Sequence, residues 1–300
     1  MAASGNTRKI RRQYPDVPQR IYLMGTCLVD GFYPQAGMDA IAFFQQAGIE
    51  VIFPQAQTCC GQPAWNSGFE DEARAVAIAQ LNAFEADIPV VVMMGSCTGM
   101  MVHEYPQMFR GTAYEAAAVA LAARTFEFSE FLINVLDVQF KSIGKTNFGA
   151  DASNAVNEET NSLKTVALHT SCSTRRGMGL AAEHMALATR LPDVKVVEPE
   201  RVTECCGFGG TFAVKQGDIS AAMANDKARA MAATGADVIT SADCGCLMNI
   251  GGTLDKLAEQ GECEPMPVAH LATLVKDAMD SSKVVIGRVT DQASAEEGSK

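Results

Sequence analysis

The cysteine residues of this chain fall into two sets with nearly the same spacing. The first set is Cys27, the adjacent pair Cys59 and Cys60, and Cys97; the second is Cys172, the adjacent pair Cys205 and Cys206, and then Cys244 and Cys246. Equivalent cysteines of the two sets are 145, 146 and 149 residues apart when Cys246 is matched with Cys97. The words CCGQP and CCGFGG repeat around the two pairs. An internal repeat of this kind predicts two similar structural units.

Strand-like and helix-like segments alternate in the same order in both halves. We expect strands over 20–27, 50–53 and 88–95 in the first half, and over 165–172, 195–198 and 236–241 in the second. Expected helices cover 34–47, 69–86, 179–190 and 218–234, and 112–140 is predicted as helix in more than one piece. The continuous apolar run at 88–94 is typical of a strand covered on both faces. The pattern predicts an α/β protein, internally duplicated, with two similar layered parallel-sheet domains related by a pseudo-twofold axis.

Changes in composition suggest the domain boundaries. Residues 142–163 are rich in Asn, Ser, Thr, Gly and acidic residues, which is typical of an exposed linker. We therefore expect a first domain over 20–141 and a second over 164–279. Residues 1–19 are predicted to form a flexible N-terminal tail, and 280–300 a polar C-terminal tail.

Composition also excludes several classes of protein. The net charge of −11 and the 7% aromatic content argue against a nucleic-acid partner, because phosphate contacts need Lys and Arg and base stacking needs aromatic rings. The longest apolar run, 88–94, is far shorter than the ~20 residues of a membrane span. No secretory signal is visible at the N-terminus, so we expect a cytoplasmic protein. Ten cysteines in such a chain indicate metal-binding or catalytic thiols rather than disulfides.

The predicted topology brings the thiols of each half together. The carboxyl ends of parallel strands meet at one edge of a sheet, so cysteines that follow separate strands can converge on one site. Four thiolates suit either zinc or an iron–sulfur cluster. Adjacent cysteines do not readily place both sulfurs on one small ion, so the spacing favours an iron–sulfur cluster. Gly61 and Gly207, which follow the pairs, let the backbone approach such a group closely.

These motifs resemble a known family. The two cysteine sets look like the tandem CCG domains found in heterodisulfide reductase and in the iron–sulfur subunit of glycolate oxidase. The words CCGQPAWNSG, GSC, CCGFGGTF and CLMNI resemble the lactate utilization protein A family more closely. The resemblance implies an electron-transfer subunit that works with two partners, expected to be iron–sulfur proteins, to oxidise L-lactate to pyruvate. It also implies a set of cluster ligands: Cys27, Cys59, Cys60, Cys97, Cys172, Cys205, Cys206 and Cys246.

The sequence departs from the full CCG pattern in two places. That pattern ends in C-x-x-C, but the last position is Met100 in the first half and Asn249 in the second. We therefore expect a [4Fe–4S] cluster with four thiolate ligands in each half. The second departure is Cys244, which is a possible substitute ligand, a redox thiol or a bystander. The sequence words favour Cys246 as the ligand, whereas the number of intervening residues favours Cys244.

No catalytic residue is identified, but three candidates stand near the cysteines: Cys244, His169 and Arg175. His169 can donate to a cluster sulfur or carry protons, and Arg175 can offset cluster charge or meet a carboxylate substrate. No nicotinamide or flavin fingerprint is present, although two-electron oxidation of a hydroxy acid usually needs such a cofactor. The chain is thus expected to be an oxidoreductase component rather than the complete catalyst. Two alternatives remain open: a heterodisulfide-reductase-like catalytic subunit acting on a disulfide or another 2-hydroxy acid such as glycolate, and a non-redox zinc-binding protein.

Overall fold

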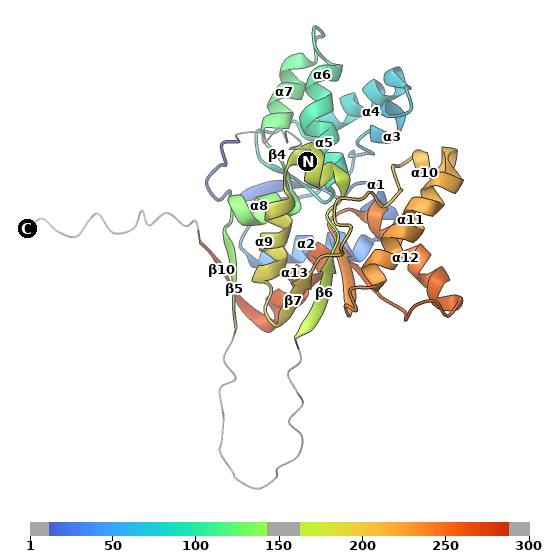
Figure 1. The fold of residues 1–300 in the computed structure, drawn as a ribbon. Coiled ribbons are helices and arrows are strands. Elements are labelled where there is room, and N and C mark those ends of the chain that lie inside the picture. The colour runs from blue at the N-terminus through green and yellow to red at the C-terminus, as the bar shows by residue number, and fades with distance from the viewer. Residues whose placement is uncertain (1–11, 143–162, 288–300) are drawn as a thin grey trace, which may run out of the picture.

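The computed structural model describes residues 12–142 and 163–287, and it contains two four-stranded parallel sheets with the same strand order. The first sheet has the order β2-β1-β3-β4, with β1 at Arg20–Met24, β2 at Glu50–Ile52, β3 at Val90–Val92 and β4 at Thr125–Glu127. The second has the order β7-β6-β8-β9, with β6 at Lys164–Leu168, β7 at Val194–Val197, β8 at Val238–Ser241 and β9 at Val268–His270. The duplicated α/β fold expected from the cysteine spacing is confirmed (Figure 1).

The strand register repeats as well as the strand order. Tyr22 of β1 pairs with Ile52 and Val90, and Ala167 of β6 pairs with Val197 and Ile239. These partners are separated by the same 145 and 149 residues that separate the cysteines. Each residue of one sheet therefore has a defined counterpart in the other.

Helices connect the strands of each sheet. In the first half they are α1 (Cys27–Phe32), α2 (Pro34–Gln46), α3 (Gln62–Trp65), α4 (Glu70–Ala83), α5 (Gly95–Gly99), the π-helix η1 (Met100–Glu104), α6 (Tyr105–Met108), α7 (Glu115–Ala123) and α8 (Phe128–Asn134). In the second half they are the π-helix η2 (Ser173–Met178), α9 (Ala181–Arg190), α10 (Phe212–Lys215), α11 (Gly217–Ala232), α12 (Cys244–Glu259) and α13 (Leu271–Ser281). No helix among residues 12–142 and 163–287 is both long enough and apolar enough to cross a bilayer.

Helices α4 and α11 occupy the same place in the repeat. Their buried faces match position by position, 147 residues apart: Ala73, Ala77, Gln80 and Leu81 in α4, and Ser220, Ala224, Lys227 and Ala228 in α11. Small side chains on these faces let each helix lie close to the loop that carries its paired cysteines. Gln80 and Lys227, both fully buried, are therefore equivalent residues of different chemistry.

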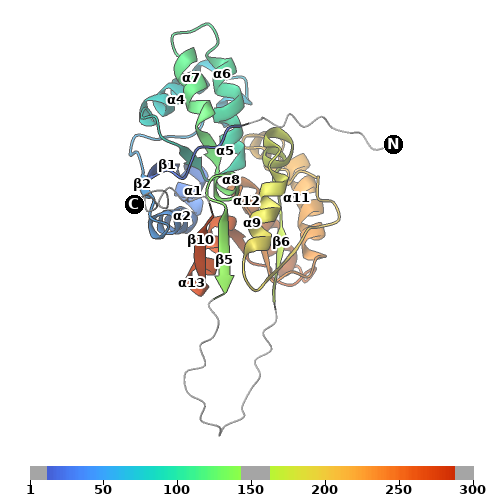
Figure 2. The same ribbon diagram turned by 90° about the vertical axis from the view of Figure 1, so that its left-hand side faces the viewer.

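Two expectations about secondary structure were wrong. Region 112–140, expected to be helix in more than one piece, also contains β4 and the start of β5 (Val138–Ser142). The short strand β4 is buried at every position, so sheet pairing with β3 overrides the helical character of the surrounding residues. The segment expected to start a polar tail at residue 280 completes α13 and then forms β10 (Ser282–Ile286). Strand β10 pairs antiparallel with β5, so it joins the end of the second half to the end of the first (Figure 2).

The other expected tails and the linker are only partly described. Residues 12–19 of the predicted N-terminal tail pack on the first half, where the ring of Tyr14 lies 6.1 Å from that of Phe126. Residues 1–11 and 288–300 lie outside the described part of the chain, as do residues 143–162 of the expected linker.

The two halves share one apolar core. Helix α13 of the second half packs on α2 of the first, and α9 packs on α8. Leu271 and Val275 of α13 are fully buried in the same cluster as Phe43 and Phe44 of α2. This contact holds the carboxyl edges of the two sheets in one relative position, and those edges carry the cysteines.

Candidate functional site

Each cysteine of the two repeated sets lies just beyond the carboxyl end of a parallel strand. Cys27 begins α1 after β1, Cys97 lies in α5 after β3, and Cys172 and Cys246 follow β6 and β8. The adjacent pairs follow β2 and β7. All the expected ligands line one pocket of about 410 Å³ between the halves: Cys27, Cys59, Cys60, Cys97, Cys172, Cys205, Cys206 and Cys246. The fold therefore brings both repeated sets to a common opening.

Within each set the thiols are close but not bonded. The sulfurs of Cys27 and Cys59 are 3.7 Å apart, and those of Cys206 and Cys246 are 3.1 Å apart. A disulfide needs about 2.05 Å, and all the cysteines are free. Cys27 and Cys172 are exposed, whereas the deeper members of each set are buried. Each set therefore runs from the protein surface into the core.

Hydrogen bonds between thiols polarise the two sets in the same way. The pKa of Cys59 is lowered to about 2, because the thiols of Cys27 and Cys60 donate hydrogen bonds to its sulfur. The pKa of Cys205 is likewise lowered to about 2, with Cys172 and Cys206 as the donors. The pKa of each donor is raised in turn. Each half thus holds a thiolate among thiols whose protons a bound metal would displace.

Glycine shapes the loop after each cysteine pair. Gly61 and Gly207 have φ values of +84° and +82°, a region that side-chain-bearing residues rarely adopt. A Cβ atom on Gly207 would also lie 2.7 Å from the carbonyl oxygen of Ser220. This close approach leaves the Gly207 amide directed at the Cys205 sulfur, 3.4 Å away. A backbone amide that bonds a sulfur ligand is an interaction that tunes iron–sulfur sites.

Further polar side chains hold the paired cysteines, and sequence reasoning did not single out their role. The hydroxyl of Tyr105 donates to the carbonyl oxygen of Cys60 at 2.9 Å. The side-chain amide of Asn249 donates to the carbonyl oxygen of Cys206 at 2.7 Å. In the sequence, the only sign of a role for Asn249 is that it replaces the last cysteine of the C-x-x-C pattern. Nothing in the sequence distinguishes Tyr105.

The three catalytic candidates lie in different surroundings. Cys244 is fully buried in the shared core and does not line the pocket. Arg175 is paired with Glu198 at 2.8 Å, and it does not line the pocket either. His169 is buried behind the second set, where its ring nitrogen lies within 4.8 Å of the sulfurs of Cys206 and Cys246. The His169 ring therefore lies beside two of the expected ligands, whereas Cys244 interacts with Cys97 and Cys246 from within the core.

Contacts across the pocket tie the two cysteine sets together. The carboxylate of Asp243 accepts a hydrogen bond from the backbone amide of Ser96, which precedes Cys97, at 3.2 Å. Burial raises the pKa of Asp243. The hydroxyls of Ser67 and Thr211, from opposite halves, are 2.8 Å apart. Hydrogen bonds between the two halves therefore hold residues that line the pocket.

The donor atoms of the site fit an iron–sulfur cluster. Sulfur-only donor sets select soft metals and clusters. The sulfurs of Cys206 and Cys246 lie within 4.8 Å of each other, close enough to share a metal centre, and the ring of His169 lies within the same distance of both. The site also supplies the Gly207 backbone amide to the Cys205 sulfur. The residues present therefore fit such a group in chemistry and in burial.

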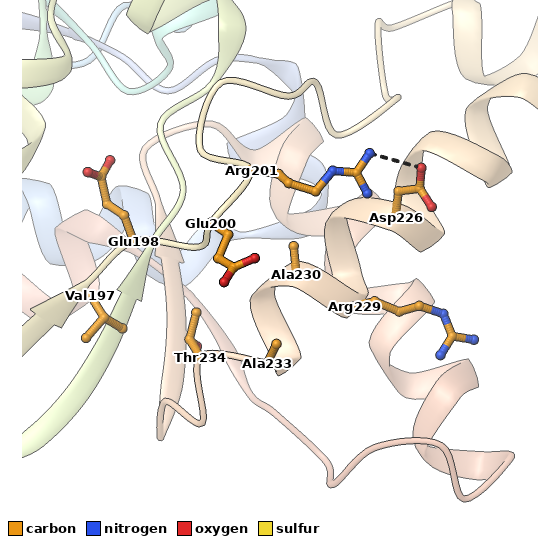
Figure 3. A pocket seen from close by; sticks show the side chains of 9 residues that line it. All are labelled: Val197, Glu198, Glu200, Arg201, Asp226, Arg229, Ala230, Ala233 and Thr234. Carbon is orange, nitrogen blue, oxygen red and sulfur yellow. Dashed lines mark hydrogen bonds and ion pairs between the residues drawn. The ribbon is translucent and has the colours of Figure 1, made fainter.

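A larger hollow elsewhere in the described chain lacks this chemistry. This hollow, of about 500 Å³, lies on the second half between the loop after β7 and α11 (Figure 3). Two of its charged residues pair across it, since Arg201 lies 3.4 Å from Asp226, and Arg201 also contacts Glu204 at 2.6 Å. No cysteine lines it. The pocket at the cysteines is therefore the candidate site.

Comparison with protein families gives a match in both halves. The cysteine-rich domain model named CCG matches residues 22–102 and 166–251. Together these segments cover more than half of the chain, and they contain the two cysteine sets. The domain is therefore present in two copies.

Individual relatives match over most of the chain. It is 36% identical over 263 residues to lactate utilization protein A 2 of Bacillus cereus strain AH820, which covers 87% of this chain and 99% of the relative. It is 37% identical over 260 residues to lactate utilization protein A of Geobacillus sp. strain WCH70, covering 85% and 98%. Among solved structures, a hypothetical protein from Helicobacter pylori matches with a TM-score of 0.52 and 11% identity. That match covers 89% of this chain but only half of the other, and it concerns the fold alone.

Proposed function

Because this chain belongs to the family of proteins with tandem cysteine-rich CCG domains, and within it to the lactate utilization protein A homologues, we propose that it is the iron–sulfur electron-transfer subunit of a multi-component system that oxidises L-lactate to pyruvate. A role in lactate utilisation follows from these relatives. The single observation that carries the electron-transfer role is the convergence of two equivalent thiol sets on one pocket.

We assign one [4Fe–4S] cluster to each half. The ligands would be Cys27, Cys59, Cys60 and Cys97 in the first half, and Cys172, Cys205, Cys206 and Cys246 in the second. A cluster at each site would accept and release single electrons. The proximity of Cys246 to Cys206, and the position of Cys244 outside the pocket, support Cys246 as the fourth ligand of the second half.

The residues of the chain would orient and shield these sites. Tyr105 and Asn249 hold the carbonyl groups of the paired cysteines, so the ligand loops keep their shape when the sites change charge. The buried sulfurs of Cys60 and Cys206 keep water from the inner side. Exposed Cys27 and Cys172 bring the outer side within reach of a docked partner, as electron transfer requires.

Lactate oxidation removes two electrons and two protons, which one-electron centres alone accomplish poorly. We therefore propose that a partner subunit takes the hydride equivalent and that this chain relays the electrons in the cytoplasm. The heterodisulfide-type alternative gains no support from Cys244, because that thiol is fully buried in the core and does not line the pocket, so a substrate there does not reach it. The zinc alternative is decided by the metal that the protein carries.

The test begins with the full chain purified without oxygen. Iron, zinc and acid-labile sulfide are counted per chain, and EPR spectra are recorded after reduction with dithionite. The proposal expects about eight irons and eight sulfides per chain, with signals typical of cubane clusters. Zinc without sulfide would refute it and favour the non-redox alternative.

The lactate role needs a second measurement. The oxidised chain is mixed with L-lactate, with and without the other proteins of the proposed system, and bleaching of the visible absorption is followed. We expect bleaching only when the partners are present. Bleaching by lactate with the chain alone would transfer the catalytic step to this subunit, and no bleaching in the complete mixture would contradict the relay role.

A further inference from the structure

Two buried positions beside the thiols differ between the halves. Met24, at the end of β1, corresponds to His169, which directly follows β6. Gln80 of α4 corresponds to Lys227 of α11, as the matching buried faces of the two helices establish. All four side chains are buried. A neutral pair in the first half is therefore replaced by an ionisable pair in the second.

The pair in the first half, Met24 and Gln80, carries no charge, and the Gln80 side chain is hydrogen-bonded at both its oxygen and its nitrogen. The side-chain amide of Gln80 donates to the carbonyl oxygen of Thr58 at 2.6 Å and accepts from the Thr58 amide at 3.2 Å. Its nitrogen also lies 3.9 Å from the sulfur of Met24. These groups hold the loop before Cys59 without placing a charge behind it.

The pair in the second half places a cation and an imidazole behind the thiols. The ammonium group of Lys227 donates to the carbonyl oxygen of Arg201 and interacts electrostatically with Cys206 and Cys246. Neither ring nitrogen of His169 has a hydrogen-bond partner among the described residues. The ring lies against the sulfurs of the same two cysteines. A neutral imidazole has one N–H, which can bond a sulfur there.

Two carboxylates lie near this positive charge: Glu204, which interacts electrostatically with Lys227 and pairs with Arg201, and Asp243. Asp243 interacts with Cys172 and Cys246, but it also bonds the Ser96 amide beside the first cysteine set. It stands in the wall that the two halves share. Among the cysteines, Lys227 and His169 interact with members of the second set. Lys227 also interacts with Glu204, Arg201 and Arg175.

We propose that Lys227 and His169 give the second site a higher reduction potential than the first, so that an electron shared by the two sites resides in the second half. A nearby cation and N–H donors to sulfur stabilise the more negative, reduced state of a cluster. The inference rests on the proposed function, because it requires a cluster at both sites. It makes the first half the entry for electrons from a one-electron centre of a partner subunit.

The electron count of this transfer is simple. One electron leaves the first site, which is oxidised by one electron, and enters the second site, which is reduced by one electron. No bond is made or broken, and no proton needs to move. Lys227 and His169 are tuning residues in this scheme, since neither is proposed to bind substrate.

Exchange variants of the full chain test the proposal. EPR spectra are recorded on anaerobic samples poised at successive potentials, which measures the midpoint potential of each site without an activity assay. The unsubstituted chain should show two separate one-electron steps. Lys227→Gln, which installs the residue of the first half, should lower the higher midpoint and leave the lower one in place. Gln80→Lys should raise the lower midpoint, and His169→Met should lower the higher one.

Lys227→Arg is the matched control, because it keeps the positive charge. The higher of its two midpoint potentials should lie closer to that of the unsubstituted chain than to that of Lys227→Gln. Equal midpoints in the unsubstituted chain, or an unchanged higher midpoint in Lys227→Gln, would overturn the inference and leave the proposed function standing. If Lys227→Gln fails to bind iron, Gln80→Lys decides, and an unmoved lower midpoint then counts against the inference. Absence of iron and sulfide from the unsubstituted chain would instead refute the proposed function.

Discussion

The sulfur of Cys206 lies 3.1 Å from the sulfur of Cys246, although the residues are 40 positions apart in the sequence. Cys246 reaches this position from the first turn of α12, and Cys206 reaches it from the loop after β7. Cys244 belongs to the same turn of α12, but residues two apart on a helix point in widely different directions. Its side chain is buried in the shared core.

Replacement of Cys246 should therefore damage the second site far more than replacement of Cys244. We expect Cys246→Ser to lose about half of the iron and sulfide of the unsubstituted chain, because a cluster lacking one of its four thiolates is poorly held. Cys244→Ala should keep the full content. Metal and sulfide analysis of anaerobically purified variants measures both. The reverse pattern would make Cys244 the ligand.

Gly207 should tolerate a side chain less well than Gly61. An alanine at either position adopts a left-handed conformation, which costs about 1–2 kcal/mol. At Gly207 the new Cβ also lies 2.7 Å from the Ser220 carbonyl oxygen, whereas at Gly61 the nearest atom is 3.3 Å away. Denaturant unfolding should rank Gly207→Ala as the more destabilising. Gly48→Ala is the control, because φ is +78° there but no atom lies within 4 Å of the added Cβ. If Gly48→Ala lost as much stability as Gly207→Ala, the close contact with Ser220 would not be the cause.

His270 should make the folded state sensitive to acid. Its Nε2 lies 3.0 Å from the Met93 carbonyl oxygen, and its Nδ1 accepts from the Ala272 amide, so the folded site holds the neutral ring. Burial lowers its pKa from 6.5 to about 4. Above pH 6.5 the ring of His270 is neutral in the folded and the unfolded chain alike, so its lowered pKa does not reduce the stability of the folded state. As the pH falls from 6.5 to 4, the unfolded chain binds the proton first, and roughly 3 kcal/mol of stability is lost.

The pH dependence can be isolated with His270→Asn, which keeps a side-chain acceptor suited to the start of α13 but does not titrate. Its stability at pH 7 should be lower than that of the unsubstituted chain, because the contact with Met93 is lost. Between pH 6.5 and 4 its denaturant midpoint should fall less steeply. Parallel slopes for the two proteins would assign the acid sensitivity to other groups.

Glu127 should contribute to stability through contacts with both halves. Its carboxylate accepts from the amides of Ser129 and Glu130 at 2.7 and 3.0 Å, and it lies 3.3 Å from Nε2 of His184 in α9. Glu127→Ala leaves the buried amides of Ser129 and Glu130 without this acceptor and should cost about 2–3 kcal/mol in denaturant unfolding. Glu70→Ala removes an exposed ion pair and should change stability by less than about 1 kcal/mol. Equal losses of stability in the two variants would show that the buried carboxylate of Glu127 contributes no more than the exposed one of Glu70.

The duplicated architecture was predictable because its signals are local. Each expected strand that ends near a cysteine is a short apolar run, and each is bounded by turn residues. Strand β4, buried within a region that reads as helix, was missed because three residues are too few to show a periodicity. Strand β10 was missed because its partner β5 lies far away in the sequence, so no local pattern announces the pairing.

By itself the sequence determined the two repeated thiol sets, their places at strand ends and the family to which the chain belongs, because cysteine spacing and strand pattern are properties of the linear chain. Tertiary structure alone decided that both sets open on one pocket, that Cys246 rather than Cys244 faces Cys206, and that His169 and Lys227 stand behind the second set. Those relationships depend on helix phase and on the packing of α13 and α9 across the two halves. Both are set by burial of surfaces that are distant in the sequence.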